Sequence, residues 1–414
     1  MSALHELRRR RDRDPDVRRC GRAPGLDRRA AGRAWLGRTL LALALATGTG
    51  CVGLPPSEEV RADVGEPVMR LRWKVLTGDT SKARQPQEFA GVAAAGAYVY
   101  GGATGGRFLA LSAETGEVRW SQRLGSISSR PVIGPDRLFV GTNDGELLAV
   151  SLDRGEVLWR YATRGPILAT PRLVGDTVVF TNEADQVYAV DARSGEFRWQ
   201  YKGETPEEYT LRGHAGATVD GELVFTGFGS GTLVALRLGN GSVAWLTQLK
   251  GEDDRFVDVD ATPVVVGDTL YVTSSSGGVW ALDKTTGLVR WRMPLEGPTA
   301  SSAQGAAGGL TSDGERLYVT AAELGIYALD LEGNILWRQG TRGGGEPAAP
   351  VVVGDRVIYV LADAGLFIAD KRTGVLLQWF DPGDGVTAEP VVVDDEAAYV
   401  LSNRGVLYAL DLRR

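Results

Sequence analysis

The apolar positions of the chain fall in short runs of β-branched and aromatic residues, interrupted by glycine and aspartate. One arrangement recurs, in which a proline and an apolar run lead to a Gly-Asp or Asp-Asp pair and then to a second apolar run. A two-residue turn of this kind between two β-branched runs predicts a β-hairpin. The arrangement is found at residues 170–176, 262–268, 349–355 and 389–395.

A second pattern ends at each tryptophan of a series, from the second tryptophan onward. Its fullest form, Ala-x-Asp-x-x-Thr-Gly-x-x-x-Trp, occupies residues 281–291. The copy that ends at Trp379 places its tryptophan one position late, so either Gln378 takes the usual position or a bulge restores it. The tryptophans of the series are 39 to 47 residues apart, and such a period indicates a repeat protein. They are Trp73, Trp120, Trp159, Trp199, Trp245, Trp291, Trp337 and Trp379.

Each repeat contains enough apolar runs for four short strands. An isolated four-stranded sheet cannot bury both of its faces, whereas sheets packed side by side around an axis can. The sequence therefore predicts an all-β fold, an eight-bladed β-propeller of four-stranded antiparallel blades over residues 68–414. The last repeat stops before its tryptophan strand, and residues 70–75 supply such a strand without a blade, so we expect the N-terminal strand to close the ring. We expect all eight tryptophans to pack between adjacent blades rather than to stack on a cofactor.

The segment before the repeats has the organisation of an exported protein. Residues 39–47 form an uncharged apolar run, too short to span a bilayer, and Arg33 and Arg38 precede it. Small residues and then Cys51 follow, and this junction resembles the lipobox of bacterial lipoproteins. The resemblance implies cleavage before Cys51 and lipidation of that cysteine. The alternative is an ordinary signal peptide whose cysteine is incidental.

We accordingly assign residues 1–50 to a signal peptide of the lipoprotein type and the polar residues 51–67 to a tether. A twin-arginine signal at Arg28 and Arg29 is a less well matched alternative. Val52 stands where lipoproteins retained in the inner membrane more typically have aspartate, so the resemblance favours the outer membrane.

Charge and composition exclude several classes of function. The chain has 46 basic and 52 acidic residues; residues 1–38 hold twelve arginines and five acidic residues, which leaves 34 basic and 47 acidic, net −13, in the rest. An acidic body is repelled by phosphate backbones, so we expect no nucleic-acid partner. Of the two cysteines and two histidines, His5 and Cys20 lie in the assigned signal peptide, so Cys51 and His214 alone cannot build a zinc cluster, and we expect neither a metal nor a cofactor.

Two segments depart from the repeat, residues 209–214 ahead of the fourth blade and residues 253–263 at the start of the fifth. Within them, Leu-Arg-Gly at 211–213 and Asp-Val-Asp-x-Thr-Pro-Val-Val-Val at 258–266 resemble the BamB family of outer-membrane protein assembly factors. The resemblance extends over the lipobox, the tether and all eight blades. It implies a periplasmic lipoprotein of the β-barrel assembly machinery.

In that family the two segments bind the barrel insertase BamA. The positions that match its contact residues are Tyr209, Leu211, Arg212, Asp258 and Asp260, although better-known members have leucine where Tyr209 stands. Asp258 and Asp260 are two residues apart, so on a strand both carboxylates point to one face, where Arg212 can pair with them or with a partner. The alternative is structural, with the carboxylates capping turns and Arg212 as their internal partner.

These observations lead to the hypothesis of a non-enzymatic scaffold, lipid-anchored in the outer membrane and facing the periplasm. It would bind a BamA-like insertase and support insertion of β-barrel proteins, with presentation of unfolded barrel strands by β-augmentation as a further role. One alternative is a periplasmic or surface lipoprotein propeller that binds another protein or ligand. A quinone-dependent dehydrogenase uses the same repeat, but it would need cysteines and insertions that this sequence lacks after Cys51. A calcium site at Asp253, Asp254, Asp258 and Asp260 would lack the bidentate glutamate of an EF-hand loop.

Overall fold

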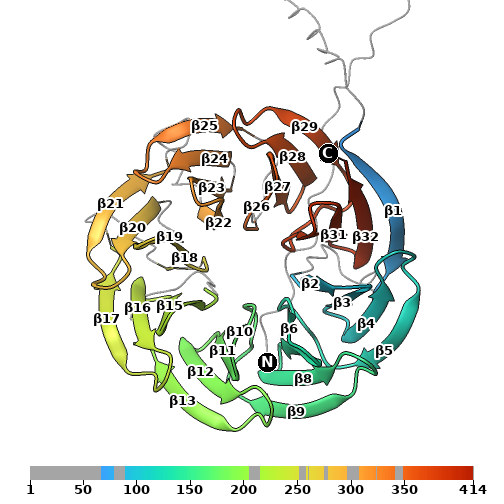
Figure 1. Ribbon diagram of the computed structural model, residues 1–414, viewed down its shortest axis with the longest axis horizontal. Coiled ribbons are helices and arrows are strands. Elements are labelled where there is room, and N and C mark those ends of the chain that lie inside the picture. Colours follow the sequence, from blue (N-terminus) through green and yellow to red (C-terminus); the bar gives the residue numbers. More distant parts are fainter. Residues whose placement is uncertain are drawn as a thin grey trace, which may run out of the picture. The chain divides into compact units, whose positions relative to one another are not determined.

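The computed structural model describes residues 67–78, 89–204, 215–250, 258–259, 261–274, 278–295, 307–322, 324–340 and 348–413. In these residues the strands β1 to β32 pair into eight four-stranded sheets, which stand as blades around a ring (Figure 1). The predicted all-β, eight-bladed propeller is confirmed. A search of the same residues finds no helix long and apolar enough to cross a membrane.

Each blade is given by its strands in chain order. Blade one contains β2 (Val92–Ala95), β3 (Tyr98–Gly102), β4 (Arg107–Ser112) and β5 (Val118–Arg123). Blade two contains β6 (Val132–Ile133), β7 (Arg137–Gly141), β8 (Glu146–Ser151) and β9 (Val157–Ala162). Blade three contains β10 (Arg172–Val174), β11 (Thr177–Asn182), β12 (Gln186–Asp191) and β13 (Phe197–Lys202). Blade four contains β14 (Thr218–Asp220), β15 (Leu223–Gly227), β16 (Thr232–Arg237) and β17 (Val243–Gln248).

The remaining blades follow the same order until the last. Blade five contains β18 (Val264–Val266), β19 (Thr269–Ser274), β20 (Gly278–Asp283) and β21 (Val289–Pro294). Blade six contains β22 (Ala307–Ser312), β23 (Arg316–Ala321), β24 (Gly325–Asp330) and β25 (Ile335–Gln339). Blade seven contains β26 (Val351–Val353), β27 (Arg356–Leu361), β28 (Gly365–Asp370) and β29 (Leu376–Phe380). Blade eight contains β30 (Val391–Val393), β31 (Ala397–Leu401) and β32 (Val406–Leu412), with β1 (Met69–Leu76) as its outermost strand.

Both ends of the described chain meet in blade eight. β1 pairs with β32 in antiparallel register from Met69 opposite Leu412 to Leu76 opposite Val406. The pairing continues past the strand, since the Thr77 amide donates to the Gly405 carbonyl at 2.8 Å. The expected ring closure by the N-terminal strand is therefore confirmed, and β1 pairs the edge of β32 and completes blade eight as its fourth strand.

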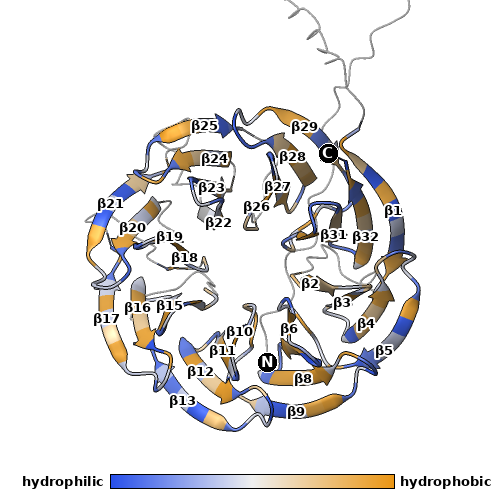
Figure 2. Ribbon diagram, in the orientation of Figure 1, coloured by the Kyte–Doolittle hydropathy of each residue, from blue (hydrophilic) through white to orange (hydrophobic). Residues whose placement is uncertain are grey.

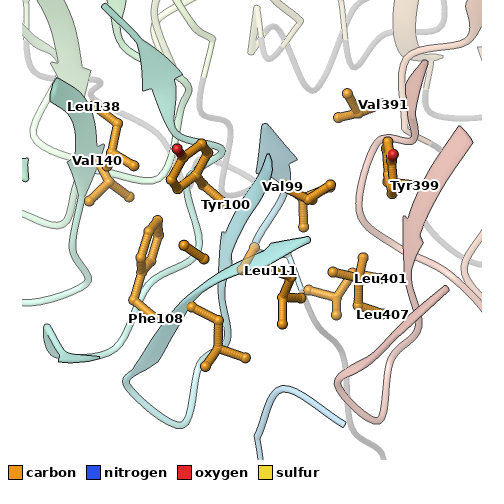
Figure 3. Packing of buried hydrophobic residues seen from close by; sticks show 14 of the residues in the cluster. Val99, Tyr100, Phe108, Leu111, Leu138, Val140, Val391, Tyr399, Leu401 and Leu407 are labelled. Carbon is orange, nitrogen blue, oxygen red and sulfur yellow. The ribbon is translucent and has the colours of Figure 1, made fainter. Parts of the chain in front are cut away.

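The core lies between the blades, because each middle strand sends alternate side chains to its two neighbours. On β8, Leu148 and Val150 belong to the cluster shared with blade one, whereas Leu147 and Ala149 belong to the cluster shared with blade three. Figure 3 shows two such layers, in which side chains of blade one meet those of blade two on one side and those of blade eight on the other. The middle strands are accordingly apolar along their length, and the outer strands alternate in hydropathy (Figure 2).

Seven of the eight tryptophans, among the residues that the structure describes, bridge each blade to the next. The indole Nε1 donates to a backbone carbonyl in the turn before the outermost strand of the following blade. The pairs, with lengths of 2.6 to 3.3 Å, are Trp73 to Ala113, Trp120 to Leu152, Trp159 to Ala192, Trp199 to Leu238, Trp245 to Lys284, Trp291 to Leu331 and Trp337 to Lys371.

The Asp-x-x-Thr-Gly part of the repeat builds the turn on which each indole lies. Oδ1 of Asp283 accepts the amides of Thr285 and Thr286 at 3.0 and 2.9 Å, and Arg290 donates to Oδ2 at 2.6 Å. These bonds, Arg290 first, lower the pKa of Asp283 to about 2. Gly287 then adopts φ +73°, and a Cβ there would lie 2.5 Å from Cε3 of Trp245. Glycine is required both by the backbone and by the indole.

Trp379 departs from this arrangement, and the expectation that it docks two blades is wrong. In the register of β28 and β29, Gln378 stands opposite Ile368, which is the place that tryptophan takes elsewhere. The Gln378 side chain accepts from the Met69 amide at 2.9 Å and donates to the Met69 carbonyl at 3.2 Å. The indole of Trp379 instead bonds Ala364 of its own blade at 2.6 Å and is 51% exposed. Of the two sequence alternatives, Gln378 takes the usual position.

Candidate partner-binding face

The two segments singled out in the sequence lie largely outside the described residues. This holds for Tyr209, Leu211, Arg212 and Asp260, and also for the expected lipidation site Cys51. Asp258 is described, as are the residues that flank both segments. The described residues that flank the two segments fix where each segment joins the propeller.

Both segments connect the outermost strand of one blade to the innermost strand of the next. The first joins β13 to β14 and the second joins β17 to β18. Their described ends are held by backbone hydrogen bonds to the turns between the two middle strands of blades three and four. These bonds run from the Gly203 amide to Asp185, from the Leu249 amide to Gly231 and from the Val259 amide to Phe228, at 2.8, 2.8 and 3.2 Å. The two segments thus start and end at neighbouring points on one side of the ring.

Asp185 links the two turns through its side chain. Its carboxylate Oδ1 accepts the Gly229 amide of blade four at 3.2 Å. Burial raises the pKa of Asp185, and the nearby Asp258 carboxylate raises it further, against the bond from Gly229 that lowers it. Two acidic groups in a partly buried setting favour a basic group beside them. This site is therefore suited electrostatically to an arginine.

Asp258 is placed differently from the sequence expectation. It lies outside any strand, ahead of β18, and its exposed fraction is 1%. The adjacent Val259 is equally buried, and it packs against Gly227, where a Cβ would lie 2.2 Å from the valine side chain. Asp258 is therefore a buried carboxylate, which agrees with the alternative that its role is structural.

The return of the first segment to the propeller is fixed by threonine hydroxyls. Thr181 of blade three donates to the Ala215 carbonyl at 2.9 Å, and Thr262 of blade five accepts the Gly216 amide at 3.1 Å. Phe228 lies 3% exposed beside this point and stacks on Tyr201 with ring centres 5.9 Å apart. Blades three, four and five thus meet where the described flanks of the two segments join the propeller.

Asp185 was missed by the sequence reasoning. The corresponding turns of blades one, two and four place glycine at this position with φ of +83°, +82° and +78°, at Gly106, Gly145 and Gly231. Asp185 adopts φ +53° in the same place, which few residues other than glycine do. The sequence marks this position, because an aspartate replaces the repeated glycine in this one of the four blades compared. Among the described residues no group of three or more His, Cys, Asp and Glu side chains is placed to hold a metal ion.

The fold and the repeat together define the class of protein. It is an eight-bladed propeller whose blades are joined by the tryptophan repeat and whose ring is closed by its first strand. The family model described as outer membrane protein assembly factor BamB matches residues 61–133, 124–305 and 276–414. The chain belongs to the BamB family.

Individual relatives carry the same description. The BamB of Pseudomonas aeruginosa is 32% identical over 340 residues, which cover 77% of this chain and 83% of that protein. The BamB of Vibrio cholerae is 32% identical over 163 residues, 38% of this chain and 40% of the relative. The BamB of Yersinia pestis is 26% identical over 67% of this chain and 60% of the relative. With the first curated relatives the match thus spans about half of their length.

Solved structures show the same fold. The crystal structure of BamB from Moraxella catarrhalis has a TM-score of 0.68 at 22% identity and covers 83% of this chain and all of that one. A quinohemoprotein alcohol dehydrogenase from Comamonas testosteroni has a TM-score of 0.65 at 16% identity, with 83% and 76% of the two chains covered. Identities this low establish the architecture alone, and enzymes share it.

Proposed function

We propose that this protein is a non-enzymatic scaffold of the outer-membrane β-barrel assembly machinery. Its propeller binds a BamA-like barrel insertase through residues 209–214 and 253–260, and it supports insertion of β-barrel proteins. The convergence of both segments on the β11–β12 and β15–β16 turns carries the proposal. Family membership supports it, because the related proteins are named as outer-membrane assembly factors.

The contact itself is assigned to Tyr209, Leu211 and Arg212 of the first segment and to Asp258 and Asp260 of the second. Tyr209, Leu211 and Arg212 supply the aromatic, apolar and basic groups that dominate interface energetics. Asp258 and Asp260 hold the arginine, since the acidic base at Asp185 and Asp258 favours a basic neighbour. Under this assignment Arg212 contacts both the aspartates of its own chain and the partner.

The same proposal fixes the protein at the outer membrane on the periplasmic side. Residues 1–50 are removed as a signal peptide, Cys51 is lipidated, and residues 51–67 tether residues 68–414 to the bilayer. The described propeller begins directly after the proposed tether, with β1 at Met69. A labelled fatty acid incorporated into the wild-type chain but not into a Cys51→Ala variant is the expected result.

Copurification from detergent-solubilised envelope tests the partner. We expect the tagged wild-type chain to recover a barrel insertase, identified by mass spectrometry, and an Arg212→Glu variant to lose it. Arg154→Glu is the matched control, since Arg154 is 74% exposed on the turn before β9, away from both segments. Equal recovery by the wild type and Arg212→Glu would contradict the site, and recovery of no insertase by the wild type would contradict the function.

The alternative enzymatic function is tested separately. If the propeller were a quinone-dependent dehydrogenase, added quinone cofactor with calcium would support dye reduction with an alcohol substrate. The proposal predicts no reduction above that of the cofactor alone.

A further inference from the structure

The outer rim of the ring is not uniform, and its most apolar stretch lies in blade seven. β29 carries no charged residue, whereas six of the other seven outermost strands in the described residues carry at least one arginine. Leu376 and Leu377 are 42% and 37% exposed, and Trp379 is 51% exposed. Figure 2 shows the apolar colour of β29 on the outside of the ring.

The outward position of Trp379 follows from the shifted register of its blade. Because Gln378 makes the contact to Met69, the next side chain is turned to the opposite face of β29. Its indole rests on Phe367, with ring centres 6.2 Å apart, and the remaining surface is left to solvent. An indole held at one side and open at the other is the arrangement found for tryptophan at membrane interfaces.

The neighbouring outer strand is the most basic. β1 contains Arg70, Arg72 and Lys74 among eight residues and no acidic residue. Arg72 is paired with Asp411, whereas Arg70 and Lys74 are exposed and form no ion pair within the described part of the chain. Leu71 and Leu76 on the same strand are 51% and 59% exposed. β1 therefore alternates basic and apolar groups on an otherwise acidic body.

The two strands are adjacent, because the Gln378 side chain bonds both backbone groups of Met69. Other outer strands show a different use of their arginines. On β5, β13 and β21, Arg119, Arg198 and Arg290 are each engaged by aspartate. The exposed side chains of β1 and β29, which we call the basic–apolar rim, are Arg70, Leu71, Lys74, Leu76, Leu376, Leu377 and Trp379.

We infer that the basic–apolar rim docks the propeller on the surface of a bilayer that contains anionic phospholipid. Lysine and arginine would meet the phosphate groups, and the indole and leucines would enter the boundary between headgroups and acyl chains. Charge complementarity supports anionic phospholipid as the partner, since β1 is the most basic outer strand of an otherwise acidic propeller. The position in the chain supports it also, because β1 is the first strand after residues 51–67, which can span at most about 60 Å.

Vesicle flotation tests the inference without the anchor. The full mature chain carrying Cys51→Ser is mixed with vesicles of phosphatidylcholine, with or without phosphatidylglycerol. We expect binding to the anionic vesicles alone, weakened by salt. Arg70→Gln with Lys74→Gln should lower the partition coefficient roughly 30-fold, and Trp379→Ser about tenfold. Lys202→Gln and Phe197→Ser, at exposed positions of β13, are the matched controls and should bind as the wild type does.

Absence of binding to anionic vesicles, or equal loss in the β13 controls, would overturn the inference. Loss of a copurifying protein by the rim variants with unchanged vesicle binding would also overturn it, and would assign the rim to a protein partner. The result is distinct from that for the proposed function, because insertase recovery depends on Arg212 and is measured on the same variants. A rim that binds lipid in a chain that recovers no insertase would leave the present inference intact.

Discussion

The contact between each docking tryptophan and the glycine of the next blade allows a quantitative test at Gly287. A Cβ added there would lie 2.5 and 2.6 Å from Cε3 and Cδ2 of Trp245, closer than carbon atoms can approach. The Trp245 side chain is 8% exposed and its Nε1 is bonded to Lys284, so it has little freedom to move. Overpacking of this kind costs about 1–3 kcal/mol. The positive φ of +73° adds about 1 kcal/mol for a residue with a Cβ.

Gly287→Ala should therefore lower the free energy of unfolding by about 2–4 kcal/mol. Gly267→Ala in the same blade is the control, because Gly267 has φ +57° but no atom within 4 Å of its Cβ position. That change should cost about 1 kcal/mol, the backbone contribution alone. Urea unfolding of both variants, followed by tryptophan fluorescence, measures the difference. Equal decreases in the free energy of unfolding of the two variants would refute the role of Gly287 in leaving space for the Trp245 indole.

Three further substitutions test other parts of the structure. Gln378→Ala removes two bonds to Met69 and should cost about 1–3 kcal/mol and speed proteolysis near β1; unchanged cleavage would contradict the clamp. Asp185→Asn keeps an acceptor and tolerates positive φ, and should raise the melting temperature at pH 7, because burial and Asp258 raise the pKa of Asp185. That gain should shrink as the pH falls through the raised pKa of the folded state, and it should vanish below about 3, where the wild-type carboxyl is protonated in both states. A gain that persists there would argue against a charge effect. The pKa of Asp283 is lowered to about 2 in the folded state, so the stability that its carboxylate contributes is complete above about pH 4 and is lost as the pH falls to about 2. Asp283→Asn should remove that part of the pH dependence when unfolding is measured across this range. An unchanged dependence of the free energy of unfolding on pH would contradict this.

Much of the fold can be read from the repeat, because the information is local. Asp283 and Gly287 define their turn within five residues, and the next tryptophan strand must follow it. The position of Trp379 could not be decided in the same way. Whether it or Gln378 faces blade eight depends on the register of β28 against β29, which is settled by pairing and by the backbone of Met69.

The candidate site was accessible to sequence reasoning only in part. Asp258 stands out by its motif, but its burial is a tertiary feature, and the adjacent Val259 packs against Gly227 of another strand. Asp185 is distant in the chain and reaches the site because blades three and four are neighbours in the ring. A pattern of residues along one segment does not reveal such a contact, although the replacement of a repeated glycine marks the position.

The central claim is that residues 209–214 and 253–260 form the binding face for a barrel insertase. Its most direct test is titration of the purified full-length chain with the purified periplasmic domains of that insertase, followed by isothermal calorimetry. The account predicts saturable binding to the wild type and to Arg154→Glu, and at least about 30-fold weaker binding to Arg212→Glu, as for an interface hot spot. Binding of all three chains with the same affinity, or of none, would contradict it.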